Sequence, residues 1–340
     1  MRILLTRLSA LGDIVHTWPL AAALAHSAPG VELAWVVEEP FMPLVAPHPA
    51  VSVAIPVATR RWRQRPLSRA TRREVAAFRR AVREFAAEVA VDPQGLVKSA
   101  VLGRLAGSPV RVGFARSHRR ELPAGVFYSR TVQPPPEARH VIDIYLSMLS
   151  AVGTEPVFGA APDGTFLARR TPAAGATAAR AAVAFVPGTG GPGKAWGAAR
   201  FAELARRLGE RGVPVVVAWG PGERELADSI VSEGGDHTEL APPTSLPELA
   251  ALLSRSAVVV GGDTGPVHLA ASLGVPTVAV FTATDPARNG PRGRRVAIVS
   301  GALGVSRRGR ARAERPGDVG VDAVFDAVAD ELGAARPGVP

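Results

Sequence analysis

Short apolar runs rich in β-branched residues alternate with longer Ala-, Leu- and Arg-rich segments along most of this 340-residue chain. The short runs have the length and composition of buried strands, and the longer segments have the spacing of amphipathic helices. Strands that alternate with helices pair in parallel, and the helices then cover the sheet. The alternation therefore predicts an α/β fold.

The alternation occurs twice. The first half is predicted to hold strands near 2–6, 32–37, 52–57, 88–91 and 111–114, with helices near 14–26, 68–86 and 97–106. The second half is predicted to hold strands near 182–186, 213–218, 257–260 and 276–281, with helices near 198–210, 222–233, 246–254 and 265–273. Between them, residues 154–180 are rich in Ala, Pro, Gly and Thr, as linkers are.

We therefore expect two Rossmann-like domains that face a central cleft. The predicted divisions are an N-terminal domain at 1–155, a linker at 156–180, a C-terminal domain at 181–320 and a helix at 321–334. This last helix could pack back on the N-terminal domain. Residues 301–318 are rich in Gly, Arg and Ala without periodicity, which predicts an exposed loop.

The composition favours a soluble cytoplasmic protein. The chain has no cysteine, which suits a reducing compartment. The first apolar run ends near Thr6 and is too short for a signal peptide. No apolar run reaches the roughly 20 residues that a membrane span needs.

The net charge of +10 first suggests a nucleic-acid partner. Aromatic residues make up only 5% of the chain, however, and no recognition motif is visible, so we expect no nucleic-acid binding. Much of the charge lies at residues 60–83, which hold ten arginines and one acid, Glu74. From Arg69 onward, the solvated face of a helix is an equally good interpretation. The segment 60–63 instead follows a predicted strand directly, which predicts one of the loops where ligands bind in open α/β sheets.

Only two of the 40 basic residues are lysines, Lys98 and Lys194. Each lies in a Gly-containing segment that can be read as an anion site. In a chain that uses arginine almost everywhere, a lysine indicates a need for a compact ammonium group.

Asp13 follows the first predicted strand at a strand-to-helix turn. It could be the N-cap of the next helix. Alternatively, it could present a carboxylate at the mouth of the cleft as a general base.

A second turn, at residues 261–268, leads from a predicted strand into an apolar helix. The first turn of such a helix directs backbone N–H groups at a ligand, and Thr264 adds a hydroxyl, which suits phosphate. Asp263 could be an ordinary N-cap and His268 an ordinary core histidine. Thr189, Lys194 and Glu223 follow other strands of the same predicted sheet and are expected to meet at this edge.

Several common sites are missing from the sequence. It has no G-x-G-x-x-G dinucleotide motif, no P-loop, no D-x-D pair and no histidines at metal-ligand spacing. It also has no G-x-S-x-G elbow. We therefore expect no metal and no bound cofactor.

Several segments of the sequence resemble glycosyltransferase family 9. They are Leu11-Gly-Asp-Ile-Val-His-Thr17, Trp35 to Glu39, the arginine-rich 60–63, Gln94 to Ser99, Arg120-Glu-Leu-Pro123 with Phe127-Tyr128, Lys194-Ala-Trp196, Trp219-Gly220 and Asp263 to His268. Two of them, 60–63 and 94–99, narrow the resemblance to the heptosyltransferase I branch.

The resemblance implies a two-domain GT-B fold and a metal-independent, inverting transfer of heptose from ADP-heptose to a Kdo-lipid A type acceptor. It implies that the acceptor is an anionic glycolipid met at the inner leaflet of the membrane by a peripheral protein. We expect this protein to be a monomer. A related transferase of another glycan or natural-product pathway remains the alternative.

The resemblance also assigns roles to residues. Asp13 would be the catalytic base, and Lys194 would assist departure of ADP. The donor contacts would be Thr189, Lys194, Glu223, Asp263, Thr264, Gly265 and His268. The acceptor contacts would be Arg60, Arg61, Arg63, Lys98, Arg120 and His140.

Overall fold

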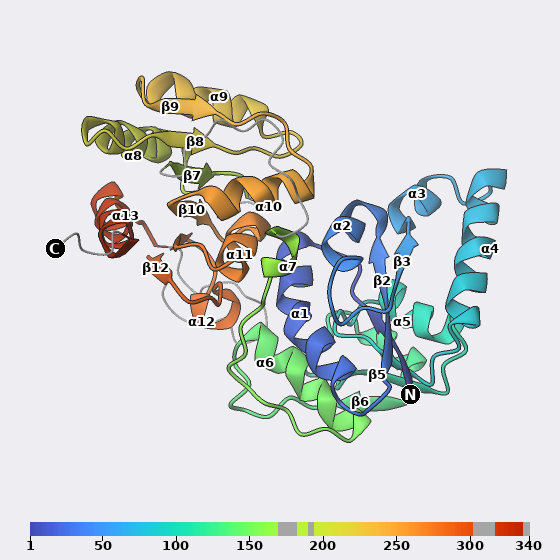
Figure 1. Cartoon of the computed structure of the whole chain (residues 1–340). Coiled ribbons are helices and arrows are strands. Elements are labelled where there is room, and N and C mark those ends of the chain that lie inside the picture. Colours follow the sequence, from blue (N-terminus) through green and yellow to red (C-terminus); the bar gives the residue numbers. More distant parts are fainter. Residues whose placement is uncertain (169–181, 190–193, 302–316, 336–340) are drawn as a thin grey trace. The chain divides into compact units, whose positions relative to one another are not determined.

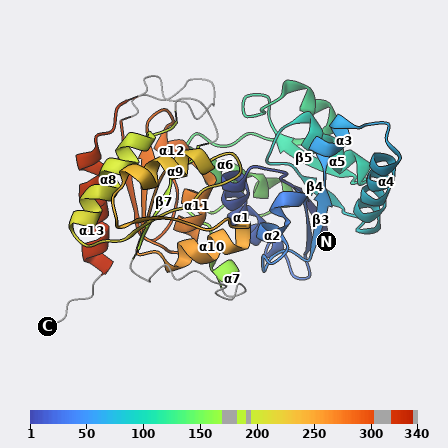
Figure 2. The same ribbon diagram turned by 90° about the horizontal axis from the view of Figure 1, so that it is seen from above.

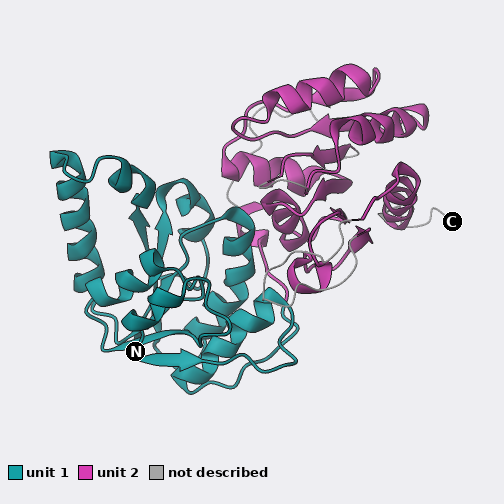
Figure 3. Ribbon diagram, turned by 180° about the vertical axis from the view of Figure 1, so that it is seen from behind, with its two compact units in different colours: residues 1–160 teal, residues 161–340 magenta. Residues whose placement is uncertain are grey.

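The structure of the chain is a computed structural model that describes residues 1–168, 182–189, 194–301 and 317–335. The chain divides into two compact units, unit 1 at residues 1–160 and unit 2 at residues 161–340 (Figure 3). Each unit is built around its own sheet and is described by itself.

Unit 1 contains a six-stranded parallel sheet of order β3-β2-β1-β4-β5-β6 (Figure 1). The strands are β1 Arg2–Thr6, β2 Glu32–Glu38, β3 Val53–Val57, β4 Val89–Val91, β5 Val110–Phe114 and β6 Arg130–Val132. The helices are α1 Leu11–Ala25, α2 Met42–Val45, α3 Thr59–Gln64, α4 Arg69–Glu84, α5 Val97–Leu105 and α6 Val141–Leu146, with short 3-10 turns η1 Glu39–Phe41, η2 Leu122–Phe127 and η3 Ser147–Val152.

Both faces of this sheet are covered, which explains the continuous apolar runs in its sequence. The consecutive residues Ile3, Leu4 and Leu5 of β1 are all fully buried, although neighbouring side chains of a strand point to opposite faces. On one face, Leu4 packs in a cluster with Phe78 and Val82 of α4. Burial on both faces fixes the strand order, and with it the edge at which the connecting loops gather.

Unit 2 repeats the plan with a parallel sheet of order β12-β11-β10-β7-β8-β9. Its strands are β7 Val183–Val186, β8 Val215–Val217, β9 Thr238–Leu240, β10 Val258–Gly262, β11 Thr277–Phe281 and β12 Val296–Ser300. Its helices are α7 Thr165–Ala168, α8 Ala198–Glu210, α9 Arg224–Glu233, α10 Leu246–Arg255, α11 Gly265–Ser272, α12 Pro286–Asn289 and α13 Val321–Ala335.

The C-terminal helix α13 packs within unit 2. It lies beside α8 and against β10, β11 and β12 (Figures 1 and 2). Val324 and Val328 are fully buried there, in the same cluster as Phe201 of α8. Packing of this helix on the N-terminal domain stays a prediction.

The predicted α/β class with two Rossmann-like halves is confirmed by the two parallel sheets. One local prediction is wrong. Residues 60–63 form most of the short helix α3 instead of a loop. Helix α3 does come directly after β3, the position expected for this segment. The strands β6, β9 and β12 and helix α6 were not anticipated from the sequence. Most of the predicted loop at 301–318 lies outside the described residues.

Candidate active site

Asp13 lies in the first turn of α1, just beyond the carboxyl end of β1. The N-cap position is held by Ala10, so the interpretation of Asp13 as the N-cap is wrong. Its Oδ2 instead forms an ion pair with Nη2 of Arg7 at 2.6 Å and accepts a long hydrogen bond of 3.4 Å from the backbone N–H of Ala10. The carboxylate remains about one-third exposed, and a group from solvent can therefore reach it.

Arg7, whose side chain is buried, holds the Asp13 carboxylate in place. Its side chain is only 1% exposed, with its guanidinium 5.2 Å from the ring centroid of Tyr145 and its Nη1 donating to the carbonyl of Pro93 at 3.4 Å. Burial by itself would lower the pKa of Arg7, but the charge of Asp13 and other nearby groups raises it above its ordinary value. Arg7 therefore stays charged. The sequence offered no signal for this role among so many arginines.

The end of β4 carries a buried polar network around Asp92. The Asp92 carboxylate accepts the N–H groups of Gln94 at 2.9 Å and Gly95 at 3.2 Å, and the hydroxyls of Ser99 at 2.8 Å and Tyr128 at 2.7 Å. Burial raises the pKa of Asp92 despite these donors. Because Asp92 uses these two backbone N–H groups itself, the turn before Lys98 is not an open anion site of the kind predicted.

The same network supports the turn that precedes Asp13. Oε1 of Gln94 accepts the backbone N–H of Leu8 at 2.9 Å, and Nε1 of Trp35 donates to the carbonyl of Arg7 at 3.0 Å. Strands β2 and β4 thus hold the turn after β1 from both sides. The family resemblance includes Gln94 but assigns no role to it.

Arg120 precedes η2, which packs against α5, the helix that carries Lys98. Lys98 is half-buried in the first turn of α5. Arg120 is exposed, and its backbone N lies 3.2 Å from where a Cβ on Gly95 would stand. The first N–H of α5, at Val97, is already bound at 2.7 Å by the carboxylate of Glu121. An anion here would therefore be met by side chains.

His140 is buried at the start of α6. Its Nδ1 accepts the backbone N–H of Ile142 at 3.2 Å, which makes it the N-cap of that helix. Its ring meets that of His16, from α1, edge to face at 5.8 Å. The fold thus brings His140 to the helix that carries Asp13, although only 6% of the residue is exposed.

The three predicted acceptor arginines of α3 differ in their surroundings. Arg61 makes ion pairs with Glu39 at 2.8 Å and Glu74 at 2.9 Å, which hold its pKa above the ordinary value. Arg60 and Arg63 are exposed, and the described part of the chain records no ion pair for either. Of the three arginines, these two are the ones free to meet an outside anion.

In unit 2, the predicted donor residues gather at the carboxyl edge of the sheet around Asp263. Nζ of Lys194 lies 2.5 Å from Oδ2 of Asp263, and the hydroxyl of Thr284 donates to the same oxygen at 2.9 Å. Nε2 of His268 lies 3.5 Å from the other carboxylate oxygen. Thr284 follows β11 and was not among the predicted site residues. Its hydroxyl at a strand end was the only signal available.

Asp263 is a charged anchor at the end of β10. The N-cap of α11 is Thr264, so the interpretation of Asp263 as a plain N-cap is wrong. Burial would raise the pKa of Asp263, but its bond to His268 and the charge of Lys194 bring that pKa well below its usual range. Asp263 is only 8% exposed on its side chain, whereas Lys194 is 31% exposed. The ammonium group of Lys194 therefore contacts Asp263, while the Lys194 side chain remains accessible to solvent.

Thr189 and Glu223 lie at the same edge. The methyl group of Thr189 lies 3.4 Å from where a Cβ on Gly262 would stand. The carboxylate of Glu223 lies over Gly188, where any side chain would collide with it, and accepts the backbone N–H of Gly220 at 2.8 Å. Thr264 and Gly265 begin α11 beside Asp263. Residues 190–193 of the Gly-rich segment lie outside the described residues.

The described residues contain no group of three or more His, Asp or Glu side chains placed to hold a metal ion. Within the same residues, no helix has the length and apolar character to cross a membrane.

The comparisons with known proteins agree with this arrangement. The sequence model described as glycosyltransferase family 9 (heptosyltransferase) matches residues 75–314. The chain is 36% identical to lipopolysaccharide heptosyltransferase 1 of Pseudomonas aeruginosa, over 86% of this chain and 82% of that protein. The chain belongs to glycosyltransferase family 9. The Escherichia coli K12 relative of the same description is 32% identical, over 86% of this chain and 92% of that protein.

Solved structures of family 9 members extend the match to the whole fold. The structure described as E. coli heptosyltransferase WaaC with ADP matches with a TM-score of 0.81 and 30% identity, over 97% of this chain and 100% of that one. The same enzyme with ADP-2-deoxy-2-fluoro heptose matches with a TM-score of 0.77. The chain is therefore a glycosyltransferase with the GT-B fold, as expected from its resemblance to family 9.

Proposed function

We propose that this enzyme transfers heptose from ADP-heptose to a Kdo-lipid A type acceptor, with inversion and without a metal ion. The observation that carries the donor half of the proposal is the Lys194 ammonium at the carboxyl edge of the unit 2 sheet. It is anchored by Asp263 on one side and open on the other. The relatives described as lipopolysaccharide heptosyltransferase 1 and the solved relative with an ADP-heptose analogue support the choice of donor and pathway.

In the proposed reaction, an acceptor hydroxyl attacks the anomeric carbon on the face opposite ADP. The new bond joins that carbon to the acceptor oxygen, and the bond to the β-phosphate oxygen breaks. Asp13 takes the proton of the hydroxyl as general base. Its ion pair with buried Arg7 holds the carboxylate in one orientation, which leaves the other oxygen for the proton.

The departing ADP gains negative charge, which must be met at the donor site. An ammonium group has three donors, so Lys194 can keep its contact with Asp263 while it donates to the pyrophosphate. The first N–H groups of α11 and the hydroxyl of Thr264 add to the same site. Glu223 is proposed to accept hydrogen bonds from the ribose hydroxyls.

For the acceptor, we propose Arg60, Arg61, Arg63, Lys98, Arg120 and His140 as contacts. Arg60 and Arg63 are proposed to bind its carboxylates and phosphates directly, since both are exposed and carry no recorded acid partner in the described residues. Arg61 would act by holding α3 to Glu39 and Glu74. The protein is proposed to work as a cytoplasmic monomer at the inner membrane surface.

The test is turnover of a panel of nucleotide sugars with a Kdo-lipid A acceptor, followed by mass spectrometry. We expect ADP-heptose to be the preferred donor and activity to survive EDTA. Asp13→Asn should lower kcat by roughly 10²- to 10⁴-fold, as loss of a general base does, while ADP affinity stays within about threefold. The amide keeps an oxygen for Arg7, which makes it a better variant than Asp13→Ala.

An exposed acid of unit 1, Glu32 at the start of β2, provides the control, because Glu32→Gln should leave turnover unchanged. If Asp13→Asn keeps the parental kcat, Asp13 is only the partner of Arg7. Preference for another nucleotide sugar would overturn the donor assignment, and loss of activity in EDTA would overturn the metal-independent mechanism.

A further inference from the structure

Helix α4 has two sharply different faces. Its buried side chains are Thr71, Phe78 and Val82, which pack toward β3 and the core of unit 1. Six exposed arginines lie on the remaining surface, at positions 69, 72, 73, 79, 80 and 83. At 100° per residue, these six positions fall within about 120° of the helix circumference, and the centre of that arc lies about 140° from the centre of the buried positions. We call these six residues the basic face of α4.

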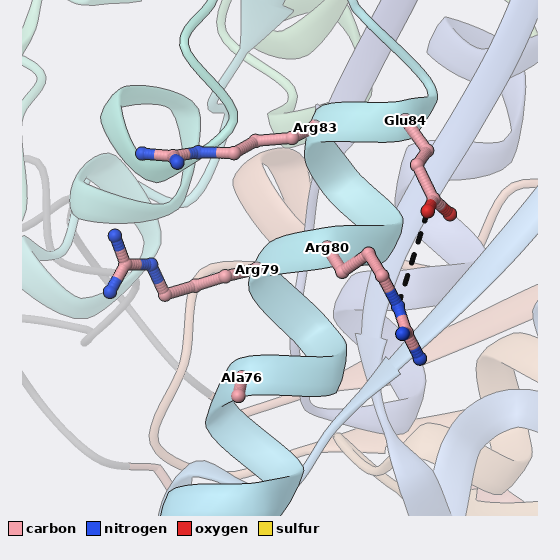
Figure 4. A pocket seen from close by; sticks show the side chains of 5 residues that line it. All are labelled: Ala76, Arg79, Arg80, Arg83 and Glu84. Carbon is pink, nitrogen blue, oxygen red and sulfur yellow. Dashed lines mark ion pairs between the residues drawn. The ribbon is translucent and has the colours of Figure 1, made fainter.

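The basic face is long, straight and uncovered. The 16 residues of α4 span about 24 Å. The helix lies at the outer border of unit 1, beyond the edge strand β3 (Figures 1 and 3). Figure 4 shows Arg79 and Arg83 extending to one side of the helix and Arg80 with Glu84 to the other; together with Ala76 these residues line a shallow hollow.

Most charges of this face have no acid partner among the described residues. Arg80 has a long contact of 4.0 Å with Glu84, and Arg83 donates to the carbonyl of Leu105. The described residues record no ion pair for Arg69, Arg72, Arg73 or Arg79. Like charges three and four positions apart on a helix destabilise it, and a solvated helix usually alternates them with acids. The arrangement is therefore one that an outside anionic surface would relieve.

An exposed apolar side chain lies at the start of the same helix. Leu67 is 77% exposed in the turn that leads to Ser68, the N-cap of α4. Arg65 and Arg69, both exposed, flank it at two residues on either side. An apolar tip among arginines suits the boundary between lipid headgroups and acyl chains, where it can be buried while the cations meet phosphates.

We propose that the basic face of α4, together with Leu67, docks the enzyme on a bilayer that contains anionic phospholipid. The proposal rests on the proposed function only in that both place the enzyme at a membrane. It concerns residues other than the acceptor arginines of α3, the helix that packs beside α4. A nucleic acid fits less well, because the basic face has no exposed aromatic side chain for stacking on bases. The aromatic residues near this face are turned inward: Phe78 is buried, and Trp62 of α3 packs on Phe78 and donates to Glu74 at 2.7 Å.

The test measures partition of the full chain onto phosphatidylcholine vesicles with and without phosphatidylglycerol. Neither vesicle contains a glycolipid acceptor, so the result does not depend on glycosyl transfer. We expect binding only with phosphatidylglycerol and weakening with salt. The triple variant Arg69→Gln, Arg72→Gln, Arg79→Gln should partition roughly 100-fold less, since each arginine near an anionic leaflet contributes about a factor of five. Leu67→Ser should weaken partition several-fold.

Two controls match these variants. Arg206→Gln, Arg211→Gln, Arg294→Gln removes the same charge from exposed positions of unit 2, and Val157→Ser changes a residue that is 76% exposed in the segment after η3 of unit 1. Both should partition like the parent. The α4 variant should keep the parental melting temperature and turn over a delipidated acceptor normally.

The proposal is overturned if the α4 variant partitions like the parent, or if the unit 2 control loses as much. It is also overturned if the parent binds duplex DNA or RNA at physiological salt but not the anionic vesicles. Failure of the enzyme to use ADP-heptose would overturn the proposed function and leave the vesicle result standing.

Discussion

The contact between Lys194 and Asp263 gives the donor site its chemical character. A lysine bound to a buried carboxylate is held in place, yet its remaining donors stay available because Lys194 is 31% exposed. Thr284 and His268 satisfy the same carboxylate from two other elements, so Asp263 does not depend on Lys194 alone. Asp263 is therefore a positioning residue, and Lys194 is the group that would meet phosphate.

Replacing Lys194 by alanine is expected to weaken ADP binding and also to lower kcat, because the ammonium opposes charge that grows as ADP departs. Lys194→Arg should recover only part of both, since a planar guanidinium cannot keep the same geometry at Asp263. Calorimetric titration with ADP and single-turnover kinetics would measure the two effects separately.

Arg206→Ala is the control for this prediction, because Arg206 lies in the same unit, is exposed and pairs only with Glu203. It should change neither quantity, as exposed ion pairs contribute little. Normal ADP affinity and kcat in Lys194→Ala would mean that the phosphate site lies elsewhere.

The sequence pointed to some of these residues and could not point to others. Lys194 stood out because lysine is rare in this chain, and Asp263 because it follows a buried strand. Arg7 had no such signal, and Thr284 had only its hydroxyl at a strand end. Their roles depend on β4, α6 and β10 folding beside them, and contacts between distant elements leave no local pattern in the sequence.

The three arginines of helix α3 differ in their contacts. Its six residues are held by Arg61, which bridges Glu39 and Glu74, and by Trp62, which packs on Phe78 of α4. The hydroxyl of Thr59 also donates to the carboxylate of Glu38. With these contacts made inward, Arg60 and Arg63 remain outside.

The double variant Arg60→Gln, Arg63→Gln is expected to raise the acceptor KM and to flatten its dependence on salt, with the donor KM unchanged. Initial rates at several salt concentrations measure both. The double variant Arg104→Gln, Arg206→Gln removes equal charge from exposed positions away from α3 and should leave the acceptor KM as it is. An unaltered acceptor KM in the α3 variant at low salt would contradict the assignment of these arginines.

Elements were predictable where their pattern was long enough to show a period. Helices such as α4 and α8 were expected within a few residues of their observed bounds. The strands β6 and β9 have only three residues each and include polar ones, whereas the equally short β4 and β8 are wholly apolar and could be predicted. Helix α3 was taken for a loop because its stability comes from Glu74 and Phe78, which the sequence places in a different element.

The molecule as a whole consists of two units that each bury their own apolar cluster. In unit 1 the cluster joins β1–β3 to α4 and α5, and in unit 2 it joins the central strands to α8, α9 and α13. The doubled alternation in the sequence predicted this division, because each half carries a full set of strands and helices. The predicted limits at 155 and 181 remain predictions. A ligand held by one sheet edge is expected to stabilise that unit first.

Hydrogen exchange of the full chain with ADP would test this expectation. We expect slower exchange in residues 187–189 and in the turn and first helical residues after β10, since these backbone groups would meet the nucleotide. At an ADP concentration near 100 times its Kd, amides that open only when unit 2 unfolds should exchange roughly 100-fold more slowly. Amides of β1 and β2 should keep their rates, because their hydrogen bonds and packing lie within unit 1. Asp13→Asn should show the same protection as the parent, whereas Lys194→Ala should lose it. Protection that appears chiefly in β1 and β2, or an undisturbed turn after β10, would place the nucleotide outside unit 2 and contradict the division of roles between the two units.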